Sequence, residues 1–115
     1  MHNSIGIDIV EWKKARSFYG RHRARLDSFL TASEKKFVEN GPKPDKALAM
    51  IFAAKEAAFK TLGMSWMGPE GFRRIKVRPV SSKRFSFLTP GGRKLRITFK
   101  MNRRYVVACC VPPSV

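Results

Sequence analysis

Cysteine, acidic side chains and long hydrophobic runs are all scarce in this 115-residue sequence. Cys109 and Cys110 are adjacent in an alternating segment, so their side chains point to opposite faces and a bond between them is not expected. The sequence has no CxxC motif and no Cys/His spacing typical of a zinc site. Its apolar runs are too short to cross a bilayer, and the N-terminus lacks a secretory hydrophobic stretch. We therefore expect a cytoplasmic protein with reduced cysteines.

The shortage of acidic residues leaves a large positive charge. Lys and Arg number 24 against 8 Asp and Glu, which gives a formal net charge of +16. Such a chain attracts polyanions, so nucleic acid, an anionic membrane or an acidic protein could be the partner. The basic residues lie in both the first and the last third of the chain, and charge alone does not choose among these partners. The length and the 43% hydrophobic content predict a single domain over residues 1–115.

The longest helical pattern runs from Asp45 to Gly63, with Asp45 as the expected N-cap and Gly63 as the expected C-terminal stop. Steps of 100° per residue place the larger apolar side chains on one arc: Leu48, Ile51, Phe52, Phe59 and Leu62. Lys55 falls inside this arc, where a charge is costly unless it is paired or its stem snorkels to the surface.

Glu56 lies at the edge of the arc, with Lys60 four residues further on. The small side chains of Ala49 and Ala53 share this strip, so an acid and a base next to the core could form the wall of a ligand site. The alternative is an ordinary amphipathic helix with one salt bridge between Glu56 and Lys60.

A strand is predicted over Ser4 to Glu11, where Ile5, Ile7 and Ile9 alternate with other residues and form one apolar face. Asp8 projects from the opposite face. Aspartate is depleted inside strands, so its presence has two explanations. It is either an edge-strand charge that limits aggregation, or a carboxylate on a rigid strand that is aimed at a cation.

The remaining segments complete an α+β domain, with a small antiparallel sheet packed against a long central helix and shorter helices. Thr31 and Glu34 fit a capping box for a helix through Val38. The other predicted elements are a basic helix Trp12–Tyr19 that ends at a Gly20 turn, an amphipathic segment Arg21–Leu30, and strands over Phe72–Val80, Phe85–Leu88, Leu95–Lys100 and Tyr105–Val111. Turns are expected at Gly68-Pro69 and Pro90-Gly91-Gly92.

Three of these stretches, in this order and at this spacing, resemble the holo-[acyl-carrier-protein] synthases of the 4'-phosphopantetheinyl transferase superfamily. They are SIGIDIVE at residues 4–11, the Phe29-Leu30-Thr31-x-x-Glu34 stretch, and FAAKEAAFKTLG at residues 52–63. The similarity runs from Ser4 to about Gly63 and continues more loosely to Val111.

The resemblance implies a transferase of fatty acid biosynthesis. A carrier-protein serine attacks the β-phosphate of coenzyme A, the phosphopantetheine arm is transferred, and 3',5'-ADP leaves. It implies that Asp8 and Glu56 bind Mg²⁺, which prefers carboxylate, phosphate and water oxygens. Lys60 would contact the phosphates or help to deprotonate the serine, with Glu56 or a metal-bound water as other possible bases. The implied contacts to coenzyme A are Lys46, Lys55, Lys60 and Gly63, with a structural pairing as an equal alternative for Lys55.

The resemblance also assigns a use to the positive charge. In the family, the basic helix after the first strand docks on an acidic acyl carrier protein, and the alternative is a solvated basic face. The residues implied here are Lys13, Lys14, Arg16, Arg21, Arg23 and Arg25. A homotrimer with coenzyme A between subunits is implied as well.

Two positions depart from the family pattern. Ile51 stands where relatives have an arginine, for which Lys43 or Lys46 could substitute, and Met101 stands where they have a histidine of the coenzyme A site. The competing hypothesis is a non-catalytic basic module that binds a carrier protein or nucleic acid. Two carboxylates in one cleft disfavour the nucleic-acid version, because they would repel phosphates.

Overall fold

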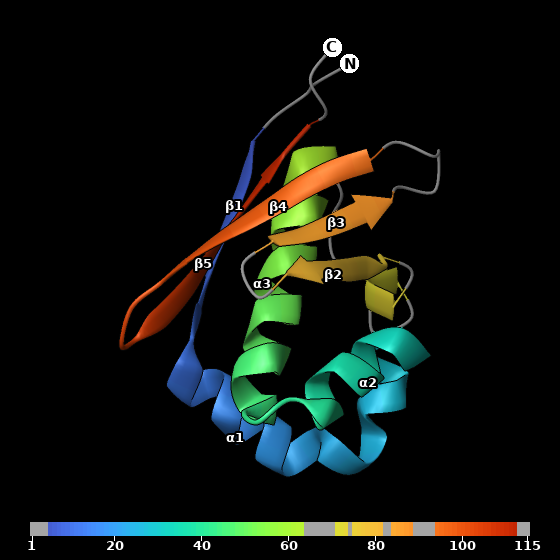
Figure 1. Cartoon of the computed structure of the whole chain (residues 1–115), viewed down its shortest axis with the longest axis vertical. Helices are drawn as coiled ribbons and strands as arrows, with labels where there is room; N and C mark the ends of the chain where they lie inside the picture. Colours follow the sequence, from blue (N-terminus) through green and yellow to red (C-terminus); the bar gives the residue numbers. More distant parts are fainter. Residues whose placement is uncertain (1–4, 64–70, 74, 82–83, 89–93, 113–115) are drawn as a thin grey trace.

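The protein folds around one antiparallel sheet, seen in the computed structural model, which describes residues 5–63, 71–73, 75–81, 84–88 and 94–112 (Figure 1). Five strands follow one another across it in the order β1-β5-β4-β3-β2. Their bounds are β1 Gly6–Glu11, β2 Val77–Ser81, β3 Arg84–Leu88, β4 Lys94–Met101 and β5 Tyr105–Val111. The prediction of an α+β fold with a small antiparallel sheet is confirmed.

One long helix, α3 (Pro44–Leu62), lies along one face of the sheet, as Figure 1 shows. The N-terminal half of the chain supplies the shorter helices α1 (Trp12–His22), η1 (Arg23–Ser28, a 3₁₀ helix) and α2 (Ala32–Asn40), which gather near the N-terminal end of α3. The capping box at the start of α2 is present: the Thr31 hydroxyl accepts from the Glu34 N–H, and Glu34 accepts from the Thr31 N–H. Within the described residues, no helix is both long and apolar enough to span a bilayer.

The start of α3 differs from the prediction. Pro44 is the first helical residue and Lys43 is the N-cap, without a side-chain capping bond. Asp45 was the wrong choice of cap, because proline has a fixed φ and no N–H to satisfy, and so it begins a helix well. The Asp45 carboxylate lies in the first turn and accepts from the Lys46 N–H. Gly63 ends the helix as predicted, with a φ of 65° that favours glycine.

Two further elements also differ from the prediction. The helix α1 continues through Gly20 to His22, and the Phe18 and His22 rings, on either side of that glycine in the sequence, make a tilted contact with centroids 4.3 Å apart. Phe72 belongs to a helical turn over residues 71–73, and the strand begins only at Val77. In both places packing of an aromatic ring outweighs the local pattern. The predicted turns at 68–69 and 90–92 lie outside the described residues.

The strand β1 is at the edge of the sheet, and its isoleucines face away from α3. Ile5, Ile7 and Ile9 are 62%, 51% and 58% exposed. Ile7 pairs with Cys109 and Ile9 with Val107 on β5, which are half-buried on the same outer face. The residues between the isoleucines, Asp8 among them, therefore face the helix.

Candidate active site

The site begins with a contact between the first strand and the central helix. Asp8 on β1 accepts a hydrogen bond from Lys60 on α3, with Oδ1 and Nζ 3.2 Å apart. The Lys60 ammonium also donates to the main-chain carbonyl of Ile7 at 2.9 Å. The Asp8 side chain is 19% exposed and the Lys60 side chain 54% exposed. Lys60 thus pairs with Asp8, and not with Glu56 as the alternative of an ordinary amphipathic helix required.

Glu56 lies one helical turn before Lys60 and within electrostatic reach of Asp8. It forms no hydrogen bond or ion pair with any other residue that the structure describes. Partial burial raises the pKa of Glu56, the Asp8 charge raises it further, and Lys60 lowers it. Partial burial also raises the pKa of Asp8, against the lowering effect of Lys60. Two half-buried carboxylates therefore lie within electrostatic reach of one ammonium group, which is bonded to Asp8 and not to Glu56.

A close approach of β1 to α3 brings these groups together. A Cβ added at Gly6 would overlap the Ala57 carbonyl oxygen and the Thr61 hydroxyl. The Thr61 hydroxyl lies 3.0 Å from the Ala57 carbonyl oxygen and 3.1 Å from that of Cys110, so it also ties α3 to β5. Because only glycine allows this spacing, Gly6 sets how far Asp8 stands from the helix.

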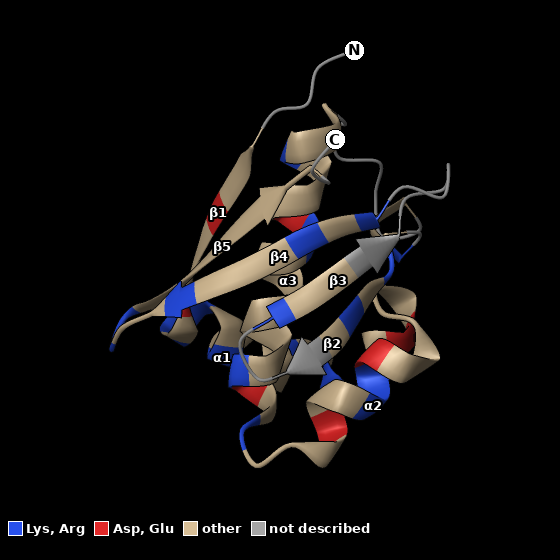
Figure 2. Cartoon of the chain, turned by 45° about the horizontal axis from the view of Figure 1, so that its top comes forward, with Lys and Arg blue, Asp and Glu red and all other residues tan. Residues whose placement is uncertain are grey.

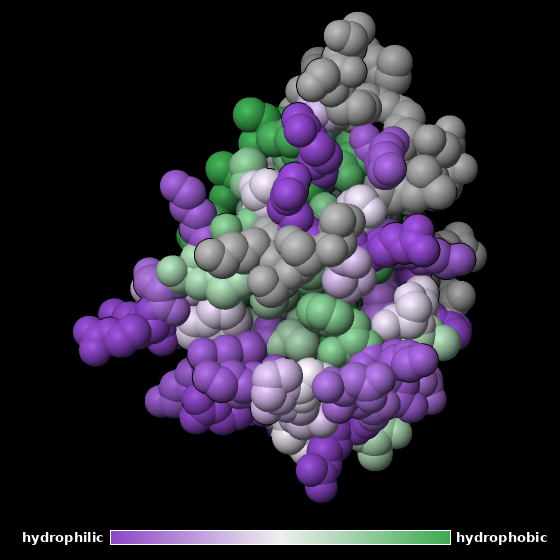
Figure 3. Space-filling model, in the orientation of Figure 1, coloured by the Kyte–Doolittle hydropathy of each residue, from purple (hydrophilic) through white to green (hydrophobic). Residues whose placement is uncertain are grey.

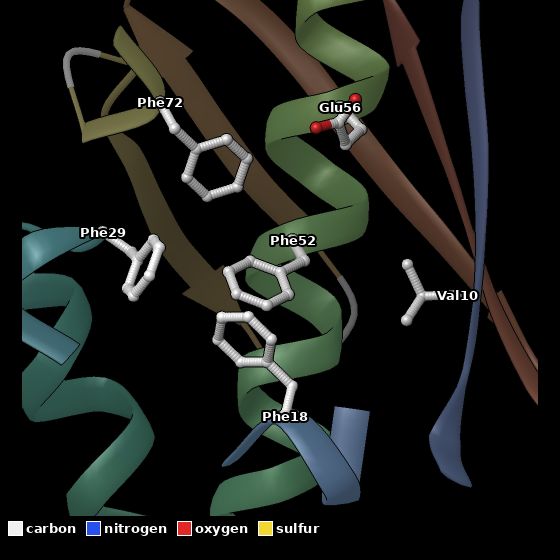
Figure 4. A pocket seen from close by; sticks show the side chains of 6 residues that line it. All are labelled: Val10, Phe18, Phe29, Phe52, Glu56 and Phe72. Atoms are coloured by element: carbon white, nitrogen blue, oxygen red, sulfur yellow. The ribbon is translucent and has the colours of Figure 1, made fainter. Parts of the chain in front are cut away.

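An apolar pocket of about 340 Å³ opens next to Glu56. Glu56 is its one charged lining residue among those described. Figure 4 shows Glu56 and Phe52 on α3, with Phe18 of α1 below them and Val10 of β1 on the opposite side. The lining residues are Val10, Phe18, Phe29, Phe52, Glu56 and Phe72. The Glu56 carboxylate thus lines the apolar pocket and is also within electrostatic reach of Asp8 and Lys60.

Lys55, the residue before Glu56, does not line this pocket. Its side chain has no exposed surface, and its ammonium lies 2.8 Å from the equally buried carboxylate of Glu34. Burial lowers the pKa of Lys55, and the neighbouring Glu34 raises it. The geometry therefore favours the structural alternative for Lys55 over a contact with coenzyme A.

The other residues expected to contact coenzyme A lie in different places. Lys46 is near the N-terminus of α3, and its ammonium stands 5.2 Å from the centre of the Trp12 ring. Fourteen residues separate it from Lys60, or about 21 Å along a helix axis. Gly63 caps the C-terminal end of the same helix. Ile51 is fully buried in the core, and Met101 is 44% exposed at the end of β4.

The six basic residues predicted to dock a carrier protein are exposed on α1 and η1. Figure 3 shows hydrophilic surface gathered over the lower end of the molecule, where α1 lies in the same view. Figure 2 shows Lys and Arg on α1, β3 and β4, with few acidic segments between them. Phe18 lines the pocket from the same helix, so the basic surface of α1 borders the pocket that contains Glu56.

The donor set can be tested for a metal ion. Within the described ranges, no group of three or more His, Cys, Asp or Glu side chains lies close enough to hold a metal. Asp8 and Glu56 provide two hard oxygen donors in a half-buried cleft, where burial penalises their negative charge. Mg²⁺ is commonly held by one or two carboxylates, with phosphate oxygens and waters as its other ligands. The two residues fit such an ion and do not fit a zinc site made only of protein ligands.

Residues 4–110 match the 4'-phosphopantetheinyl transferase superfamily. This chain belongs to that superfamily. A curated member, the holo-[acyl-carrier-protein] synthase of Chlorobium limicola, is 31% identical over 93% of this chain and 90% of its own length. The holo-[acyl-carrier-protein] synthase of Chlorobaculum tepidum is 45% identical over 51% of each chain.

Solved structures of the superfamily have the same fold. The holo-[acyl-carrier-protein] synthase of Neisseria meningitidis aligns with a TM-score of 0.79 and 27% identity, over 99% of this chain and 100% of that one. A holo-(acyl-carrier-protein) synthase from Bacillus anthracis, solved in complex with CoA (3',5'-ADP), gives a TM-score of 0.79 at 24% identity and covers 98% of this chain and 97% of that one. The family resemblance inferred from the three motifs is confirmed.

Sequence reasoning missed the structural roles of two residues close to the proposed site, Gly6 and Glu34. Gly6 was treated only as one alternating position of a strand, although a glycine before an aspartate in a strand can indicate a close backbone approach. Glu34 was recognised as a capping residue and as part of a family motif, but not as the partner of Lys55. A buried lysine requires an acidic partner, and this requirement was the available signal for the pairing with Lys55.

Proposed function

We propose that this chain is a holo-[acyl-carrier-protein] synthase, which transfers 4'-phosphopantetheine from coenzyme A to a serine of an acyl carrier protein and releases 3',5'-ADP. The observation that carries the proposal is the cluster of Asp8, Glu56 and Lys60, in a chain of the superfamily that performs this transfer. We assign the activity to a single domain over residues 1–115 acting in the cytoplasm, in keeping with the free thiols of Cys109 and Cys110.

Asp8 and Glu56 are the proposed ligands of Mg²⁺. These two carboxylates would hold the ion, which would supply positive charge to offset the charge that develops as the phosphoanhydride bond breaks. The Lys60 ammonium donates to the Asp8 carboxylate and to the Ile7 carbonyl, which holds it beside the proposed metal ligands. This arrangement supports a role in binding the phosphates over a role in removing the proton of the serine.

The carrier protein is proposed to dock on α1 and η1. Acyl carrier proteins are acidic, and the exposed basic residues of these helices give a complementary surface. The pocket beyond Phe18 would receive an apolar side chain of the carrier protein, which would place the acceptor serine near Glu56. Such docking predicts fast association that weakens as salt is added.

A homotrimer is proposed for the assembly. The exposed isoleucines of β1 continue into the half-buried Val107 and Cys109 of β5, so an apolar surface covers this part of the sheet. Three isoleucines more than half exposed on one edge strand are unusual for a monomer, and a second copy of the chain offers the same chemistry. Sedimentation at increasing concentration tests this proposal, with Ile7→Lys expected to shift the species towards monomer.

The burial of Trp12 disfavours the nucleic-acid alternative. A single-strand binder needs exposed aromatic rings among its basic residues. Trp12 and Trp66 are the two rings that the sequence leaves as possibly exposed. Trp12 is 6% exposed, and its indole N–H donates to the Asn102 carbonyl at 2.8 Å; Trp66 lies outside the described residues.

The decisive experiment incubates the protein with coenzyme A, Mg²⁺ and an apo acyl carrier protein, and measures the mass of the carrier protein. We expect the mass of one phosphopantetheine arm to be added in the presence of Mg²⁺, and no addition with excess chelator. The matched control is Lys36→Ala, which removes an exposed charge on α2 outside the proposed site. The proposed function would be refuted if this protein left the carrier protein unmodified while a known active synthase modified the same preparation.

A further inference from the structure

A buried ion pair joins four parts of the chain next to the proposed site, at the residue before Glu56 on α3. The Lys55 ammonium donates to the Glu34 carboxylate at 2.8 Å and to the carbonyl oxygens of Phe29 at 3.3 Å and Phe72 at 3.1 Å. Three acceptors surround an ammonium that has three protons, so its hydrogen-bonding capacity is fully used. The Phe72 ring also lies 4.8 Å from this ammonium.

The carboxylate of the pair is equally well satisfied. One Glu34 oxygen accepts from the Thr31 N–H at 2.8 Å, and the other accepts from the Val77 N–H at 2.9 Å. Thr31 and Glu34 are at the start of α2, and Val77 is the first residue of β2. The pair thus connects the end of η1, the start of α2, the middle of α3 and the segment that leads into β2.

The carbonyl acceptors of Lys55 belong to residues that shape the pocket. Phe29 and Phe72 line it beside Glu56, and their backbones are joined to α3 through one ammonium group. Figure 4 shows both rings on the side of α3 away from Val10. The rings of Phe29 and Phe72 come from segments more than 40 residues apart in the sequence, so their spacing depends on a tertiary contact of this kind.

Stability alone gives a poor account of this arrangement. A buried ion pair is often no more stabilising than well-packed hydrophobic residues of similar volume, because both charges lose their hydration. Hydrogen bonds differ from hydrophobic packing in their direction, so they fix the position of the groups they join. The benefit of Lys55 is therefore to be sought in the placement of its acceptors.

We propose that Lys55 is a positioning residue: its ammonium fixes the Phe29 and Phe72 segments on α3 and so shapes the pocket that receives the carrier protein beside Glu56. The inference rests on the proposed function, since it takes the carrier protein to be the occupant of the pocket. Glu34 acts through Lys55, as the counter-charge that keeps the ammonium buried. Lys55 itself touches neither coenzyme A nor the serine.

The test separates stability from position with two variants. Lys55→Met keeps an unbranched side chain that is one atom shorter but leaves the Glu34 carboxylate buried without its partner, and we expect the melting temperature to fall by on the order of 10 °C. The double variant Glu34→Gln with Lys55→Met removes both charges, and most of this loss should be recovered. In both variants the Phe29 and Phe72 carbonyls lose the hydrogen bond from residue 55, while the Phe72 carbonyl still accepts from the Ile75 N–H at 3.3 Å.

The kinetic readout is KM for each of the two substrates, measured well below the melting temperature of each variant. We expect KM for the carrier protein to rise about tenfold in the single and in the double variant, while KM for coenzyme A stays within about twofold of wild type. Lys36→Met, the same substitution at an exposed position on α2, should change neither constant.

A double variant with restored stability and a wild-type KM for the carrier protein would overturn the inference, because the pair would then be purely structural. An equal rise in KM for both substrates would overturn it as well, since the defect would not be confined to the pocket. A wild-type protein that modifies no carrier protein would instead refute the proposed function, so the two failures are distinguishable.

Discussion

Two lysine–carboxylate pairs lie within two turns of each other on α3, and their surroundings differ. The pair of Lys55 and Glu34 has no exposed surface, and every polar atom in it has a partner inside the protein. The pair of Lys60 and Asp8 is open to solvent, with side chains 54% and 19% exposed. Beside it, Glu56 forms no ion pair with any described residue.

The difference shows how burial separates structure from chemistry in side chains of the same type. A satisfied, dry pair has no capacity left for a ligand, so it can only hold segments in place. A half-exposed pair with one carboxylate in excess has both an attraction for a cation and a route for it to enter. The open pair also depends on the distance between β1 and α3, which Gly6 sets.

The largest expected effect comes from removing the carboxylates of the open pair. Asp8→Ala and Glu56→Ala should each lower kcat/KM for transfer on the order of 1,000-fold, because the charge of the diphosphate would no longer be neutralised. Circular dichroism should show an intact fold. Near-normal turnover in either variant would remove the metal assignment.

The matched change in the buried pair should lower stability, which the changes in the open pair leave intact. Glu34→Ala leaves the Lys55 ammonium buried without its counter-charge, and we expect the free energy of unfolding to fall by about 3–5 kcal/mol. Chemical denaturation measures this loss. A Glu34→Ala protein as stable as wild type would show that the two pairs do not differ in the way described.

Lys60→Ala should lower kcat about 100-fold through the lost phosphate contact. Its exposed ion pair contributes little to folding, so the free energy of unfolding should change by less than about 1 kcal/mol. Steady-state kinetics and denaturation of the same preparation measure both quantities. Normal kinetics with a large loss of stability would move Lys60 into the structural class with Lys55.

Gly6→Ala tests the spacing between the strand and the helix. The added Cβ meets the Ala57 carbonyl and the Thr61 hydroxyl, so β1 must move away from α3 and carry Asp8 with it. A displacement of about 1 Å should cost roughly 100-fold in kcat. The control is Gly20→Ala on α1, where a Cβ meets open space, and it should leave kcat unchanged.

The smallest expected effect is a gain in stability. Because partial burial and Asp8 raise the pKa of Glu56 in the folded protein, its charged form destabilises the fold at neutral pH. Glu56→Gln should therefore raise the melting temperature by a few degrees at neutral pH without divalent ions. The gain should vanish as the pH falls through the raised pKa, where Glu56 is already protonated. An equal gain at all pH values would point to packing instead of charge.

Local signals in the sequence predicted much of the fold. The helix that ends at Gly63, the capping box of Thr31 and Glu34, and the strand that contains the two cysteines follow from periodicity and capping chemistry alone. The same logic failed at Gly20, where the helix continues past a glycine and the Phe18 and His22 rings on either side of it are in contact.

The site could be predicted only in part. The spacing of the motifs indicated Asp8, Glu56 and Lys60, and the structure brings these three together. The partner of Lys55 could not be identified, because Glu34 is 21 residues away and already had a local role as a capping residue. Periodicity predicted that Ile5, Ile7 and Ile9 share a face, but gave no indication that this face is the exposed one.

The strand β1 has two faces with separate tasks. Its inner face carries Asp8, and its outer face carries the isoleucines through which copies of the chain are proposed to associate. Any event that frees this edge strand from its neighbours would also loosen the carboxylate on its other side. Specific activity should then decline on dilution before the protein unfolds, so enzyme concentration becomes a variable of the assay.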